Sequence, residues 1–134
     1  MHRTLNPPGW APAKGYANGV VARGTTVFLG GQIGWNAQQL FETDDFVGQF
    51  EQTLVNILAV LKEAGAGPEH LVRMTWFITD KPAYTSRLKE IGAAYRRIIG
   101  RHYPAMSVVV VAALIEDRAR IEIEATAMLP DAAG

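Results

Sequence analysis

The 134-residue sequence contains no cysteine, and its 13 basic residues are balanced by 13 acidic ones. The absence of cysteine excludes disulfides, thiolate zinc sites and cysteine nucleophiles, and it fits a reducing compartment. A net charge of zero lacks the basic excess that is typical of proteins binding DNA or RNA. No apolar run is long enough to cross a membrane, and the N-terminal residues lack the apolar core of a signal peptide. We therefore expect a cytoplasmic protein with no nucleic-acid or membrane partner.

The chain does contain enough apolar residues, 49% of the total, to bury a core without disulfides. We expect one domain over residues 1–134. Prolines and glycines are concentrated in residues 1–15, so this segment is predicted to form an irregular arm. Trp10 is expected to anchor the arm on the body of the protein.

The spacing of apolar residues predicts the order strand, strand, helix, strand, helix, strand, strand. A tight turn with positive φ at Gly24 is expected between the first two strands. Thr43, Asp44 and Asp45 supply capping oxygens for the first helix, and Asp80 supplies one for the second. The adjacent Gly30 and Gly31 suggest a bulge or a close approach of backbones. The strands are expected at 16–23, 25–30, 71–79, 107–114 and 120–125, and the helices at 45–64 and 80–99.

The run from Ser107 to Val111 is almost continuously apolar, which predicts a strand buried on both faces. Right-handed strand–helix–strand crossovers put both helices on one face of the sheet. The other face then needs a different cover, and a second copy of the chain is the simplest one. We expect an α+β homo-oligomer whose ligand site lies between subunits.

The last strand alternates strictly, with Ile121 and Ile123 directed to the core and Glu122 and Glu124 to the opposite face. Two carboxylates beside a buried strand indicate either a solvated face or a site. Glu122 could act as a general base on a water molecule. It could equally be a solvated glutamate paired with Arg120 or a neighbouring chain, and Glu124 is expected to be structural.

A set of short motifs, taken together, is typical of one protein family. They are Tyr16 ahead of the first strand, the corner Gly30-Gly31-Gln32-Ile33, the segment Tyr103-Pro104-Ala105-x-Ser107, and the closing Ile121-Glu122-Ile123-Glu124-Ala125. Over residues 15–128 the chain resembles the Rid proteins, also called the YjgF-type family and, in older labels, L-PSP endoribonucleases or translation inhibitors.

The resemblance implies a chorismate-mutase-like α+β fold, with a mixed sheet and two helices packed on one face. It also implies a homotrimer with clefts between subunits. The implied activity is hydrolysis of reactive enamines and imines, such as 2-aminoacrylate, to keto acids and ammonia. No cofactor and no metal are expected.

Two positions depart from the deaminating branch of that family. Met106 stands where that branch has an arginine that grips the substrate carboxylate, and Gly30 stands where it has a serine. A guanidinium offers a bidentate fork, whereas a thioether offers only a weak acceptor and apolar bulk. Loss of one partner of a buried charge pair costs about 2–5 kcal/mol. We therefore expect weak or absent deamination of simple imines, although Glu122 aligns with the glutamate that positions the attacking water.

The remaining candidates each have a structural alternative. Tyr16 aligns with a cleft-lining tyrosine or is a surface aromatic residue, and Met106 is a cleft wall or core filler. Ser107 has no histidine–acid partner at a telling spacing, so a hydrolase triad has little support. The predicted substrate-binding residues are Tyr16, Gly30, Gly31, Gln32, Met106 and Ser107, and Glu122 is the predicted catalytic residue.

Other polar and aromatic residues carry less information. His2, His70 and His102 are scattered in the sequence, which makes a metal site improbable. Trp35 is expected either to cap the cleft or to pack under the arm. The sequence leaves two functions open, namely an enzyme acting on C=N bonds and a non-catalytic trimer that senses a ligand or binds a partner. Only the older family name suggests ribonuclease activity, and a net charge of zero argues against RNA binding.

Overall fold

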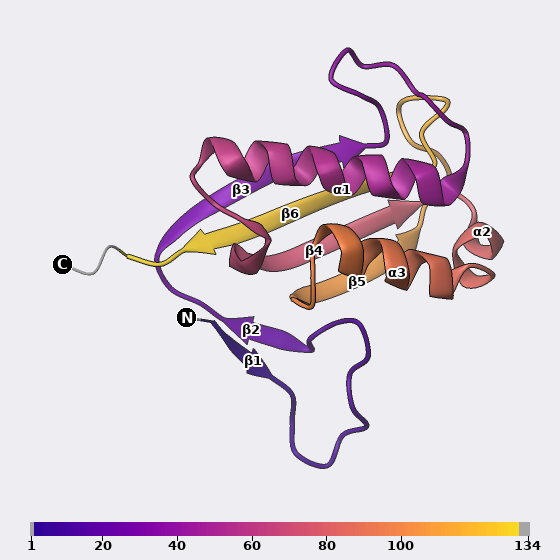
Figure 1. The fold of residues 1–134 in the computed structure, drawn as a ribbon. Helices are drawn as coiled ribbons and strands as arrows, with labels where there is room; N and C mark the ends of the chain where they lie inside the picture. Colours follow the sequence, from indigo (N-terminus) through magenta and orange to yellow (C-terminus); the bar gives the residue numbers. More distant parts are fainter. Residues whose placement is uncertain (1, 132–134) are drawn as a thin grey trace.

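The computed structural model describes residues 2–131, which form an α+β fold with a mixed sheet (Figure 1). A 3₁₀ turn at Pro68–His70 precedes β4. The elements in chain order are β1 (Arg3–Leu5), β2 (Gly19–Val21), β3 (Thr25–Ile33), α1 (Phe46–Glu63), β4 (Leu71–Ile78), α2 (Lys81–Thr85), α3 (Leu88–Ile98), β5 (Ala105–Val110) and β6 (Ile121–Leu129).

The main sheet has the strand order β3-β6-β4-β5. β4 and β5 are parallel and are joined through α2 and α3, whereas β6 runs antiparallel to both β3 and β4. Both long helices, α1 and α3, lie in front of the sheet in Figure 1, and none of the helices formed by residues 2–131 lies behind it. The predicted mixed sheet with its helices on one face is therefore confirmed.

The core lies between α1, α3 and the front of the sheet. Phe50, Leu54 and Ile57 of α1 are fully buried, as are Ile121 and Ile123 of β6. Each such side chain contributes about 1.5–3 kcal/mol through the hydrophobic effect. In β4 the alternation of buried residues is broken near its start, because the register against β6 shifts between Leu71 and Arg73; the buried residues of this strand are Leu71, Met74, Trp76 and Ile78.

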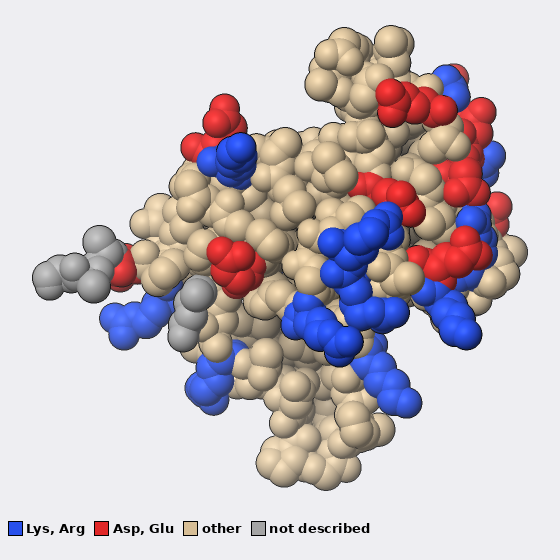
Figure 2. Space-filling model, in the orientation of Figure 1, with Lys and Arg blue, Asp and Glu red and all other residues tan. Residues whose placement is uncertain are grey.

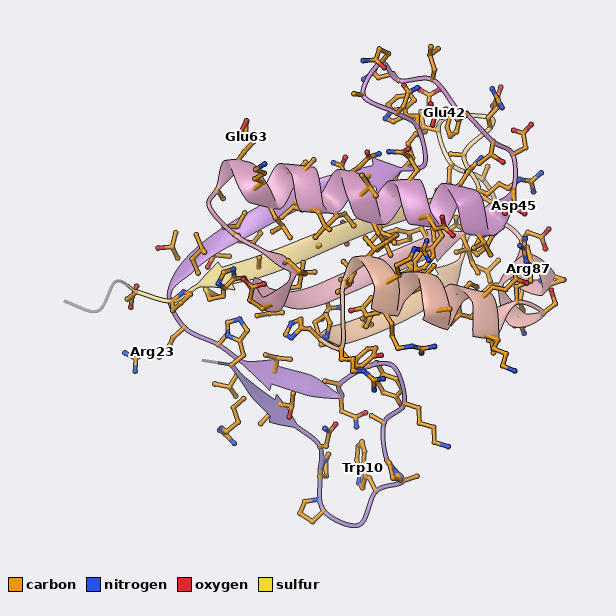
Figure 3. The ribbon with its side chains drawn as sticks, in the orientation of Figure 1. Trp10, Arg23, Glu42, Asp45, Glu63 and Arg87 are labelled. Carbon is orange, nitrogen blue, oxygen red and sulfur yellow. The ribbon has the colours of Figure 1, made fainter. Side chains whose placement is uncertain are left out.

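The start of α1 agrees with the prediction, but the second helix is divided. The Asp45 carboxylate accepts a hydrogen bond from the Gly48 amide at 3.0 Å, as an N-cap does. The predicted helix from residue 80 to 99 is interrupted at Arg87, whose φ of −129° is not helical. The Arg87 guanidinium instead donates to Asp45 at 2.6 Å and to Glu90 at 2.7 Å, and Figure 3 shows Asp45 and Arg87 close together. These pairs fix the start of α3 against the start of α1.

The N-terminal segment differs from the prediction. β2 pairs with β1 and not with β3, so the expected hairpin of 16–23 with 25–30 is wrong. Gly24 has the expected positive φ, 132°, but it directs the chain into β3, which pairs with β6. Trp10 is 64% exposed and does not anchor the arm (Figure 3).

The face of the sheet without helices, here called the open face, is largely uncovered within one chain. Val109 of β5, in register with Phe77, is 40% exposed on this face within one chain, where the sequence predicts cover by a second copy. Phe28 of β3 is 79% exposed on the same face. None of the helices in residues 2–131 has the length and apolar character needed to span a membrane.

Candidate functional site

A hollow of about 400 Å³ lies on the open face between β3, β6 and β4. Residues alternate between the two faces along these strands, so polar side chains from neighbouring strands meet here. In register, Thr75 of β4 lies opposite Glu124, and Arg73 lies opposite Thr126. The lining residues include Phe28, Gly30, Arg73, Thr75, Glu124 and Thr126. Both a cation and a carboxylate are therefore present in the hollow.

Glu122 and Gly31 are brought together beside this hollow. The predicted bulge is present, because the pairing of β3 with β6 shifts register between Leu29 and Gln32. A Cβ atom at Gly31 would lie 2.5 Å from Glu122 Oε2, so only glycine leaves the carboxylate where it is. The Gln32 side-chain Nε2 donates to the Gly30 carbonyl at 3.2 Å and closes the corner. The half-buried Glu122 carboxylate is thus held against a backbone bulge.

Ser107 of β5 lies in register with Thr75 of β4, which in turn lies in register with Glu124 of β6. These three residues form one row across the open face. Ser107 is exposed there. Of the predicted site residues, Gly30, Gly31, Ser107 and Glu122 therefore belong to one face of the sheet.

Met106 and Tyr16 lie on the other side. They line a hollow of about 240 Å³, here called the aromatic hollow, together with Trp76 and Tyr84. Met106 is in register with the buried Met74 and packs against the core. Within one chain, Met106 and Glu122 therefore lie on opposite faces of the sheet and cannot contact the same molecule.

The sequence did not single out Arg73, Trp76, Tyr84 or Lys14 as site residues. Trp76 fell on the apolar face of an alternating strand and was assigned to the core. The available signal was its indole N–H, because a buried tryptophan usually needs a hydrogen-bond partner. Burial also raises the pKa of the Tyr84 hydroxyl, which keeps it a neutral donor.

The three histidines are scattered in the sequence but lie near one another in the fold. The His2 ring contacts the His70 carbonyl at 3.3 Å, and His102 Nε2 donates to the Leu71 carbonyl at 2.7 Å. Among residues 2–131, no group of side chains has the composition and spacing of a metal site.

Trp35 packs on Phe41, with ring centroids 5.9 Å apart, in the loop before α1.

Comparison with known proteins identifies the family. Residues 7–129 match the family described as Endoribonuclease L-PSP. This chain belongs to that family. It is 34% identical over 127 residues to a RutC family protein of Synechocystis, covering 90% of each chain.

Two further relatives agree with this assignment. A 2-iminobutanoate/2-iminopropanoate deaminase of Salmonella typhimurium is 32% identical over 108 residues, which cover 78% of this chain and 80% of the relative. The crystal structure of YyfB, a Rid-family protein of unknown function from Yersinia pestis, superposes with a TM-score of 0.85 at 32% identity. That match covers 96% of this chain and 98% of YyfB. The resemblance to Rid proteins seen in the sequence is therefore confirmed, and so is the fold.

Proposed function

We propose that this Rid-family protein is a homotrimer that binds a small imine- or enamine-like molecule in clefts between subunits and hydrolyses its C=N bond. The observation that carries the proposal is the Glu122 carboxylate, held beside the Gly31 bulge on the open face of the sheet. The name of the Salmonella relative supports an imine as the substrate class. No cofactor is required for this chemistry.

The assembly follows from the placement of the candidate residues. Glu122 lies on the open face, whereas Tyr16 and Met106 lie on the side covered by helices. A cleft that uses both sets needs two copies of the chain. Exposed apolar side chains on the open face, such as Phe28 and Val109, favour its burial against another copy.

The proposed reaction adds water to the imine carbon. Glu122 accepts a proton from the water as its oxygen bonds to the carbon of the protonated imine, which gives a neutral tetrahedral aminoalcohol. That proton then passes to the nitrogen, the hydroxyl gives its own proton to Glu122 as the C–N bond breaks, and ammonia leaves a carbonyl product. An enamine substrate first takes up a proton at carbon to become the imine.

Met106 lowers the expected activity on the smallest substrates. Its thioether cannot replace the guanidinium that holds a substrate carboxylate in the deaminating branch. We expect weak or no ammonia release from 2-aminoacrylate. Larger imines, bound by apolar contacts as well, are the favoured substrates.

The test is ammonia release from a panel of imines generated in situ by an amino-acid oxidase. Glu122→Gln should lower kcat by about a hundredfold or more, the usual contribution of a positioned base. Glu63→Gln, at the exposed end of α1 and away from the hollow, is the control and should retain most activity. Equal losses in the two variants would contradict the role of Glu122.

A second possible function is ligand binding without catalysis. Met106 favours this function because its thioether cannot hold a substrate carboxylate as the arginine of the deaminating branch does. If no imine in the panel is turned over and ligand binding persists in Glu122→Gln, the protein is a binding module. Turnover that depends on Glu122 would exclude this alternative.

A further inference from the structure

A larger hollow adjoins the aromatic hollow on the helix side of the sheet. Its volume is about 380 Å³, and it lies between the arm, α2 and α3. It shares the lining residues Lys14, Gly15, Trp76 and Tyr84 with the aromatic hollow. The two hollows are therefore treated as one joined hollow, which is large enough for a ring-bearing small molecule.

The walls of the joined hollow are aromatic. The Trp76 and Tyr95 rings are stacked with centroids 6.4 Å apart, and the Tyr95 and Tyr103 rings are stacked at 5.3 Å. Tyr84 meets Trp76 edge-on, with an interplanar angle of 89°. Tyr95 is 3% exposed and Trp76 is 5% exposed, so the rings open to the hollow are those of the half-buried Tyr84 and Tyr103, which can contact a planar aromatic group.

The polar groups of the joined hollow point to an anion. Lys14 and Arg96 both line it, and no carboxylate is among the lining residues that the structure describes. Figure 2 shows that basic side chains gather over α3 on this face of the molecule. A site with cations at its rim and no acid concentrates negatively charged ligands.

We propose that the joined hollow binds a planar aromatic carboxylate. The ring lies against Tyr84 and Tyr103, and the carboxylate faces Lys14 and Arg96. This proposal shares one assumption with the proposed function, namely that the cleft at Met106 is the ligand site. It adds the chemical class of the ligand. It also explains how an anion can be held without the missing arginine.

The test is calorimetric titration of the full chain with phenylacetate, phenylacetamide and acetate. Phenylacetamide has the shape of phenylacetate without its charge, and acetate has the charge without the ring. Phenylacetate should bind at least about fivefold more tightly than either, which is the scale of one solvent-exposed charge contact. Equal binding of phenylacetate and phenylacetamide, or no binding of phenylacetate, would overturn the proposal.

Variants locate the site. Arg96→Gln and Lys14→Gln should each weaken phenylacetate by about two- to fivefold, whereas Lys89→Gln on the same helix should not, because Lys89 does not line the hollow. Unchanged affinity for phenylacetate in both Arg96→Gln and Lys14→Gln would overturn the proposal.

These outcomes are separate from those of the proposed function. Phenylacetate has no C=N bond, so its binding does not require turnover. Binding without imine hydrolysis would leave the aromatic site standing and reject the enzyme. Imine hydrolysis together with equal binding of phenylacetate and phenylacetamide would support the enzyme and reject the aromatic carboxylate site.

Discussion

Gly31 lies so close to the Glu122 carboxylate that a methyl side chain at Gly31 would push the carboxylate aside. A Cβ atom at Gly31 would lie 2.5 Å from Glu122 Oε2 and 2.7 Å from its Cδ. A Cβ atom at the neighbouring Gly30 would meet nothing within 4 Å. The bulge in β3 therefore fixes the position of the proposed base through one glycine and not through the other.

This contact predicts different effects for two similar variants. Gly31→Ala should displace the Glu122 carboxylate and lower kcat by about tenfold or more, since small displacements of a catalytic group are costly. Its stability should change by less than about 1 kcal/mol, because the end of a flexible side chain can move aside. Gly30→Ala should change neither quantity. Imine turnover and urea unfolding of the two variants provide the measurement, and equal activity of both would contradict this role for the bulge.

Restoring a guanidinium should restore activity on small substrates. Met106→Arg is expected to raise kcat/KM for 2-aminoacrylate by about 30-fold or more, since a buried carboxylate–guanidinium contact is worth about 2 kcal/mol at least. Met106→Leu keeps the apolar character and is the control. Ammonia release from 2-aminoacrylate measures both. No difference between Met106→Arg and Met106→Leu would show that this position does not face the substrate.

Gln49 should be the most important polar residue of the core. It is fully buried in α1, and its Nε2 donates to the carbonyls of Thr43 and Arg118 at 3.1 and 2.9 Å. Its Oε1 accepts from the Arg120 amide at 2.8 Å, just before β6 begins. Gln49 thereby ties the start of the strand that carries Glu122 to the helix.

Gln49→Met would break all three bonds and should lower the free energy of unfolding by roughly 2–4 kcal/mol. Gln52→Met is the control on the same helix. Gln52 makes a hydrogen bond to Asn56 at 2.9 Å, whose loss should cost about 0.5 kcal/mol or less. Urea denaturation followed by circular dichroism gives both values. Similar losses in the two variants would refute this role of Gln49.

The attachment of the N-terminal strand should depend on pH. Burial lowers the pKa of His2 below its ordinary value of 6.5, and the nearby His102 and His70 lower it further, against the hydrogen bond to the His70 carbonyl. The attached strand thus binds fewer protons at His2 than the detached strand does. Attachment should be complete above about pH 6.5 and should weaken as the pH falls below that value.

Protection of the Arg3–Leu5 amides from hydrogen exchange measures this attachment. Protection factors should fall between about pH 7.5 and pH 5.5, while those of β6 amides serve as the internal reference. His2→Gln retains a donor for the His70 carbonyl but does not titrate, so it should flatten the pH dependence. The charged groups around the site are His70, His102 and Glu69, which lies 3.6 Å from His70. An identical pH dependence in His2→Gln would assign the effect to them and contradict the prediction for His2.

The sequence correctly predicted the structural features that depend on a single segment of the chain. The bounds of α1 and the alternation of β6 follow from periodicity and capping within one segment, and both agree with the structure. The pairing of β1 with β2, the break at Arg87 and the gathering of the histidines depend on residues far apart in the chain. No local pattern encodes those contacts.

The candidate site also combines features set by one segment of the chain with features set by contacts between distant segments. The glycines at positions 30 and 31 predicted a bulge or a close approach of backbones, but the pairing of this segment with β6 was not predicted. The placement of Met106 and Glu122 on opposite faces depends on the register of β5 against β4, which the sequence does not reveal. The aromatic hollow was missed because Trp76 and Tyr84 read as ordinary core residues.

The central claim is that the open face is covered by other copies of the same chain, so that each site is built by two of them. Sedimentation equilibrium of the purified protein at micromolar concentration tests this most directly. A trimeric assembly predicts a mass equal to three chains, independent of concentration over a wide range. A mass equal to one chain would contradict it, because Tyr16 and Glu122 would then have no common cleft.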